Sequence, residues 1–299
     1  GDWGAYSRNY FYVIDLKLSD SIRTNRDPGY YFFNWLFANL GFGFWSLNLL
    51  CATITVSGVM AVAKRQPLPW IALASAVPYT LIVVGMGYTR QAAALGFICW
   101  GMAAVQDRRP WRFLFFIVLA ATFHKSAVVM APLFLFSLQR IRLHHLILLV
   151  VAIAVIVEVL VLESIEAKWA SYVETQRKSD GAAIRIAMNF IPASILLIFR
   201  KRLRLDGPEG RQWYWMALAC LVASVVVPFA GTAVDRIALY LLPLQMVVFS
   251  RLFLVTNTQL MRAVIVVSIL TYFTAVAYVW LNYASNSDAW LPYQFYPAV

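Results

Sequence analysis

The chain has 299 residues and a net charge of +11, and 62% of its residues are hydrophobic while only 13% are charged. Soluble domains carry about 25% charged residues, so this composition excludes a soluble globular protein and indicates an all-α, polytopic membrane protein. No Walker loop, CxxC pair or HExxH sequence is present, which removes the usual sequence support for ATP-driven transport and for zinc hydrolysis.

The charges are distributed unevenly over ten predicted membrane spans. The loops on one face of this arrangement hold 14 of the 25 cations but only three of the 14 acidic residues. The positive-inside rule makes that face cytoplasmic, so the charge excess does not indicate a nucleic-acid partner. The spans are predicted at residues 42–62, 69–87, 91–106, 113–123, 127–138, 146–162, 182–199, 213–230, 237–249 and 263–281.

The chain is predicted to form a single transmembrane domain over residues 1–299. An outer, aromatic-rich segment at 1–41 precedes the helix bundle at 42–281, and an outer tail follows at 282–299. Because Gly1-Asp2-Trp3 does not resemble a translation start or a signal peptide, we expect a further helix before it. The three cysteines lie far apart in apolar runs and are predicted to be small buried hydrophobes.

The outer segment contains one clear helix start. Asp27-Pro28 is typical of an N-cap followed by proline at the first helical position, so an interfacial helix is predicted over residues 28–40. The many aromatic side chains of this segment fit two interpretations, an interfacial belt or a surface that stacks against sugar rings.

Three polar sites interrupt the apolar runs, and the predicted topology puts all of them on the outer side. They are Arg90-Gln91, His124-Lys125-Ser126 and Asp235-Arg236. An arginine in such a place either snorkels to lipid headgroups or points into a cavity.

Residues 113–138 are mostly apolar but contain His124 and Lys125 near their centre. A single crossing would turn the cations at 200–211 outward, against the charge rule. Two short crossings, or a re-entrant hairpin with His124 at its tip on the periplasmic side, are therefore predicted.

Helical spacing relates further polar residues to these sites. Arg185 and Asn189 share one helical face, and Arg236 and Tyr240 share another, because residues four apart are neighbours on a helix. Asp235 is either an ion-pair partner of Arg236 or a functional carboxylate.

The inner ends of the spans are predicted to hold only basic anchors, which disfavours a cytosolic nucleotide sugar or acyl-CoA as the substrate. Several outer cations facing one cavity suit a diphosphate, which accepts forked bonds from arginine.

Several short motifs occur in order along almost the whole chain: Gly1-Asp2-Trp3-x-x-Tyr6, Asp27-Pro28-Gly29-Tyr30, Arg90-Gln91, Phe123-His124-Lys125-Ser126, and Asp235-Arg236 with Tyr240. In this order and spacing they resemble the EpsG family, bacterial exopolysaccharide proteins related to Wzy-type O-antigen and capsule polymerases. The family commonly has glutamate where this chain has Asp27, and commonly has a helix before the Gly-Asp-Trp motif.

The resemblance implies a membrane glycosyltransferase of the GT-C type in the bacterial inner membrane. Its substrate would be an undecaprenyl-diphosphate-linked oligosaccharide on the outer side. Its other partners would be membrane lipids, a chain-length regulator and a flippase. No cofactor is predicted, and dependence on a divalent metal is left open.

The residue types suggest a role for each polar group. Arg90 and Arg236, joined by Lys125 and Arg185, are predicted to hold the diphosphate and stabilise its charge as it leaves. The base for the acceptor hydroxyl is predicted to be one of three residues, in descending order His124, Asp235 and Asp2. His124 also fits a structural, hydrogen-bonded role. The residues predicted to position the substrate are Gln91, Tyr240, Trp3, Tyr6 and Tyr30.

Two other functional classes stay open. A transporter or flippase for lipid-linked glycans would also need an outer cationic cavity, but it should carry polar residues along the whole path, which this sequence lacks. A membrane O-acyltransferase would use a histidine, but its acyl-CoA donor would need a basic pocket at the inner face.

Overall fold

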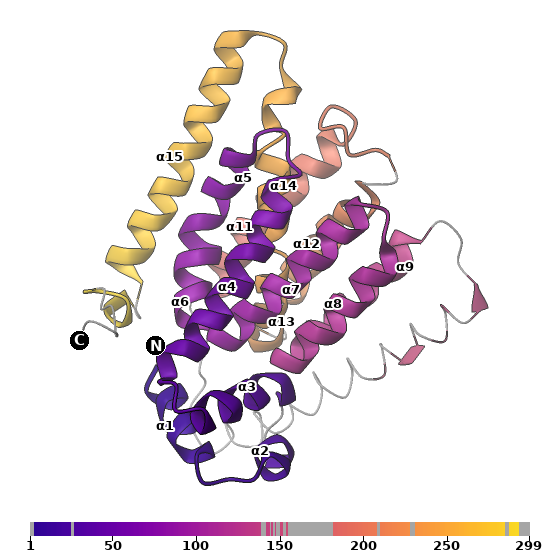
Figure 1. The fold of residues 1–299 in the computed structure, drawn as a ribbon. Coiled ribbons are helices and arrows are strands. Elements are labelled where there is room, and N and C mark those ends of the chain that lie inside the picture. The colour runs from indigo at the N-terminus through magenta and orange to yellow at the C-terminus, as the bar shows by residue number, and fades with distance from the viewer. Residues whose placement is uncertain are drawn as a thin grey trace.

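The computed structural model describes residues 3–24, 27–138, 182–207, 210–227, 231–284 and 287–292, together with isolated positions between 142 and 154. All regular elements in these ranges are helices, as predicted (Figure 1). In chain order they are α1 (Trp3–Val13), α2 (Leu18–Thr24), α3 (Pro28–Asn39), α4 (Phe44–Ala63), α5 (Pro69–Ala76), η1 (Val77–Val84), α6 (Gly85–Gly87), α7 (Thr89–Gln106), α8 (Pro110–Phe123), η2 (Lys125–Met130), α9 (Leu133–Ser137), α11 (Ala182–Phe199), α12 (Arg211–Val226), α13 (Gly231–Tyr240), α14 (Pro243–Phe249), η4 (Leu252–Val255), α15 (Gln259–Tyr283) and η5 (Ser287–Ala289).

Three of the described helices are long and apolar enough to cross a membrane. They are α4, the continuous rod of α5, η1 and α6, and α15; the pair α13 and α14, bent by 45°, makes a possible fourth. The predicted total of ten spans is therefore not confirmed. The other predicted spans fall on helices that are shorter or less apolar, and the one at 146–162 lies outside the well-described part of the chain.

Helix α7 packs between α4 and α8 and lies at the centre of the bundle. A Cβ atom on Gly58 of α4 would stand 2.1 Å from the carbonyl oxygen of Gly96 in α7, so only glycine lets the two backbones approach this closely. Leu95, Ile98 and Met102 of α7 are fully buried. This packing fixes α7 as an axis, with Arg90 and Gln91 at one end and Asp107 just beyond the other.

The chain reverses direction at His124. Helix α8 ends at Phe123, and η2 and α9 then pack back along it. The ring centres of Trp111, near the start of α8, and Phe134, in α9, are 5.0 Å apart. The reversal predicted within residues 113–138 is therefore present, with His124 at its tip, and it fits both predicted forms, two short crossings or a re-entrant hairpin.

The bundle has two distinct ends. Helices α1, α2 and α3 gather at one of them, which we call the aromatic end; the tips at 88–91, 124–126 and 234–236 belong to it (Figure 1). The loops at 64–68, 107–109, 200–207 and 250–258 lie at the opposite end, which we call the basic end (Figure 1). The alternation of basic loops predicted from the charges is thus present in the described part of the chain.

The outer segment contains more helix than predicted. Helix α3 matches the expected 28–40 closely, but α1 and α2 were not expected. Its aromatic residues differ in burial: Phe11 and Tyr12 are each 61% exposed and suit an interfacial belt, whereas Tyr6 and Tyr30 are buried in the core.

Candidate functional site

Arg90 is held at the aromatic end by groups from α1 and from the start of α3. Its Nη1 donates a hydrogen bond to Asp27 Oδ2 at 2.7 Å, and Asp27 Oδ1 accepts one from the backbone N–H of Lys125 at 3.2 Å. The Arg90 Cζ atom lies 5.5 Å from the ring centre of Tyr6 and 5.8 Å from that of Tyr30, within cation–π range. Arg90 is therefore turned into the bundle and does not snorkel to headgroups.

Asp27 does not play the local role that its position predicted. It stands before Pro28 at the start of α3, but its side chain makes no capping hydrogen bond. The side chain is only 6% exposed and instead joins Arg90 to the hairpin tip. Burial raises the pKa of this carboxyl group, while the Arg90 charge and the Lys125 N–H act to lower it. The sequence offered one signal for this role, the presence of Asp27 in the family motif.

A chain of hydrogen bonds runs from the hairpin tip to α13. His124 Nδ1 lies 2.8 Å from Ser126 Oγ, which in turn lies 3.1 Å from the hydroxyl of Tyr240. Gln91 Nε2 donates to the carbonyl oxygen of Arg236 at 3.0 Å and so ties α7 to the same helix. Four of the predicted site residues, together with Ser126, therefore meet in one cluster although they come from three distant segments.

Positive charge surrounds the imidazole of His124, which lies at the turn between α8 and η2. Burial lowers the pKa of His124 well below its usual range, and the charges of Arg90, Arg236 and Lys125 lower it further. The imidazole is therefore neutral at pH 7 and able to accept a proton. The same three cations give the cluster the electrostatic character of an anion site.

A second ion pair stands next to this cluster and joins α11 to α13. Arg185 makes a forked pair with the two oxygens of Asp235, of which the Nη2–Oδ2 contact is 2.6 Å, and its Nη1 donates to the hydroxyl of Tyr79 at 3.0 Å. Both Asp235 oxygens accept hydrogen bonds from Arg185, so Arg185 is an ion-pair partner of Asp235. Asn189 lies on the same face of α11 as Arg185, as predicted, and donates to the carbonyl oxygen of Ala238.

Two predicted residues cannot be placed in the site. Asp2 lies outside the described residues, and Trp3 begins α1 but its side chain is not described. Conversely, the structure adds Asp27, Tyr79 and Ser126 to the cluster. Ser126 follows the predicted His124-Lys125 pair directly, but Tyr79 stands within an apolar run and carries no signal that could have identified it.

A comparison with protein families gives a match over almost the whole chain. The model of the EpsG family matches residues 1–295. Neither the curated proteins nor the solved structures contain a match to this chain.

Proposed function

The chain belongs to the EpsG family, and from this premise we propose that it is a polysaccharide polymerase of the bacterial inner membrane. It would join undecaprenyl-diphosphate-linked oligosaccharide repeat units on the outer face. The observation that carries the proposal is the cluster of Arg90, Arg236 and Lys125 around a neutral, hydrogen-bonded His124.

The cations would bind the donor through its diphosphate. Guanidinium groups match phosphate oxygens in planar, forked geometry, and fixed positive charge stabilises the diphosphate as it leaves. Arg236 has its backbone carbonyl bound by Gln91, and Asp235 beside it is held by Arg185. We assign Asp235 and Arg185 chiefly to positioning Arg236, because the forked pair already engages both carboxylate oxygens. Tyr6, Tyr30 and Tyr240 would help position the substrate, as would Trp3.

His124 would act as the general base. In the tautomer whose Nδ1–H donates to Ser126, the Nε2 lone pair is available to the acceptor hydroxyl. The hydroxyl oxygen forms the new bond to the anomeric carbon, its proton passes to Nε2, and the carbon–oxygen bond to the diphosphate breaks. Undecaprenyl diphosphate leaves with the electron pair and needs no proton.

Substrate binding would also strengthen this base. The charges of Arg90, Arg236 and Lys125 depress the pKa of His124 in the unliganded protein. A diphosphate bound among them neutralises much of that charge, so the pKa of His124 rises when donor is present. General-base assistance is most effective when the pKa lies near the working pH.

The direct test is polymerisation by the purified protein in proteoliposomes. Short undecaprenyl-diphosphate-linked repeat units are supplied from outside, and the length of the lipid-linked glycan is measured. The expected product is a ladder of longer chains that His124→Asn does not make and that the basic-end control Arg202→Gln makes normally. Movement of units across the bilayer without lengthening would identify a flippase, and transfer of an acyl group alone would identify an acyltransferase; either result would overturn the proposal.

A further inference from the structure

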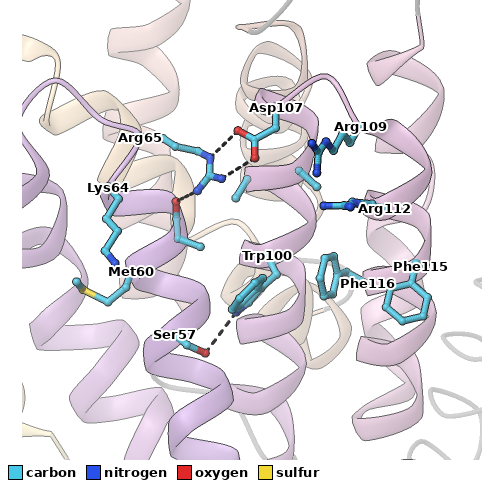
Figure 2. Close-up of a pocket in the computed structure, with 13 residues that line it drawn as sticks. Ser57, Met60, Lys64, Arg65, Trp100, Asp107, Arg109, Arg112, Phe115 and Phe116 are labelled. Carbon is cyan, nitrogen blue, oxygen red and sulfur yellow. Dashed lines mark hydrogen bonds and ion pairs between the residues drawn. The ribbon is translucent and has the colours of Figure 1, made fainter.

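The basic end contains more than the topology anchors predicted there. A cavity of about 790 Å³ is lined by residues of α4, α7 and α8 at this end (Figure 2). Its rim carries cations from the loops after α4 and α7 and from the first turn of α8, and its floor is apolar.

The charges at the rim are partly compensated. Arg65 and Asp107 form a forked ion pair that ties the end of α4 to the end of α7, with contacts of 2.9 and 2.6 Å (Figure 2). That pair leaves the positive charges of Lys64, Arg109 and Arg112 at the same cavity. Among the described residues no carboxylate oxygen lies within 4 Å of the nitrogen atoms of these three side chains. The rim therefore has an excess of positive charge.

The floor of the cavity is formed by large apolar and aromatic side chains. Trp100 of α7 and Phe116 of α8 lie with ring centres 5.7 Å apart, and Met60 closes the side toward α4. The apolar surface continues down the exposed face of α8, where Phe115 is 59% and Val118 58% exposed. A free cytosolic anion would not contact this continued apolar surface, whereas a hydrocarbon chain would pack along it.

We propose that this cavity binds an anionic membrane phospholipid. Arg109, Arg112 and Lys64 would hold the phosphate of the headgroup, and an acyl chain would run along Trp100 and Phe115 toward the bilayer centre. Basic pockets between transmembrane helices at the cytoplasmic side are suited to anionic lipid headgroups. The proposal does not rest on the proposed catalytic function, since none of these residues belongs to the cluster around His124.

The test compares an anionic and a zwitterionic lipid that differ only in the headgroup. Purified, delipidated protein in detergent is titrated with phosphatidylglycerol or phosphatidylcholine of identical acyl chains, and retained lipid is counted by native mass spectrometry. Phosphatidylglycerol should bind the wild-type chain, and R109Q/R112Q should bind it roughly 30-fold more weakly, since each cation near the surface contributes a several-fold effect. The matched control K201Q/R202Q removes two exposed cations of the same end and should bind as the wild type does.

A second measurement keeps the test independent of how the double variant folds. Phosphatidylglycerol with a brominated acyl chain should quench part of the tryptophan fluorescence of the wild-type chain, and W100F should lack the quenched part. Equal binding of both lipids, equal loss in both double variants, or unchanged quenching in W100F would each overturn the site. Competition by inorganic phosphate or a nucleotide as strong as that by the lipid would show that the cavity binds a soluble anion instead.

Discussion

The two ends of the bundle use the same residue types in different ways. At the aromatic end the carboxylates of the ion pairs are withdrawn into the protein: Asp27 is 6% exposed beside Arg90 at 31%, and Asp235 is 20% exposed beside Arg185 at 11%. At the basic end the Arg65–Asp107 pair is 33% and 44% exposed, and most of the other described cations there face outward. A buried ion pair is costly to desolvate and must be matched closely, whereas an exposed one contributes little. Burial of the pair, more than the number of cations, therefore separates a site from an anchor.

The comparison would fail outright if the two ends did not face opposite sides of the membrane. Single cysteines replacing Asn39 or Lys125 should react with a membrane-impermeant maleimide added outside intact cells, and those replacing Lys201 or Asp206 should react only after lysis. The background is low because Cys51, Cys99 and Cys220 are all buried. Labelling at 201 or 206 from outside would invert the topology and with it the proposed function.

The largest effect of a single substitution on activity is expected at His124. His124→Asn keeps a hydrogen-bonding group near Ser126 but removes the base, so polymerisation should fall by roughly 10²- to 10⁴-fold.

Because the pKa of His124 is depressed, kcat/KM of the wild type should stay high well below pH 6.5. We expect bound diphosphate to raise that pKa, so kcat should begin to fall at a higher pH than kcat/KM does as the pH is lowered. If both fall at the same pH, the donor does not neutralise the charge around His124.

The stability of the protein should show the same titration. A histidine whose folded pKa is depressed binds its proton more readily in the unfolded chain, so stability should decline as pH falls below about 6.5. The decline should be smaller in His124→Asn, as measured by thermal unfolding in detergent from pH 7 to pH 5.

Arg90 and Arg236 should follow with slightly smaller effects on activity. Removing one donor that stabilises developing negative charge costs roughly 10²- to 10³-fold, so either arginine-to-alanine variant should make little polymer at normal protein level. Lysine at either position should remain defective because it lacks the planar fork. Arg202→Ala is the matched control, since it removes an exposed arginine at the basic end. Full activity of both site variants would reduce these residues to structural groups.

The buried pair between α11 and α13 is expected to act on stability first. Arg185→Ala removes the forked partner of the buried Asp235 carboxylate, and such a loss costs about 3–5 kcal/mol. The double change Arg185→Leu with Asp235→Leu should regain much of the unfolding temperature without regaining polymerisation. If the double variant is active, the pair has no part in placing Arg236.

The exposed pair at the basic end should give the smallest change. Arg65→Ala is expected to lower the free energy of unfolding by less than about 1 kcal/mol, because solvent screens a pair of this exposure. The length distribution of the glycan should stay as in the wild type. A loss as large as that in Arg185→Ala would remove the distinction between the two ends.

The sequence predicted features that depend on composition and spacing better than features that depend on contacts. The charge pattern located the basic loops, and the conflict between a single crossing and that pattern predicted the reversal at His124. Contacts between distant segments were not accessible: Asp27 satisfies a local capping pattern, yet it binds Arg90, 63 positions away. The pairing of Asp235 with Arg185 was not accessible either, since the two residues are 50 positions apart. The predicted number of spans exceeded what the described helices support, because several apolar runs form short or broken helices.

The link from the hairpin to α13 has a consequence for how the protein is made. Ser126 and Tyr240 are 114 positions apart, so at usual synthesis rates the ribosome needs roughly 6 to 23 s to add the second after the first. During that interval the polar tip must already be accommodated in the translocon or the bilayer without the helix that completes its hydrogen bonds. Helices α8 and α9 are also too short to insert as independent spans of about 20 residues. We therefore expect the hydrogen-bond chain at the hairpin tip to be completed only after α13 is synthesised.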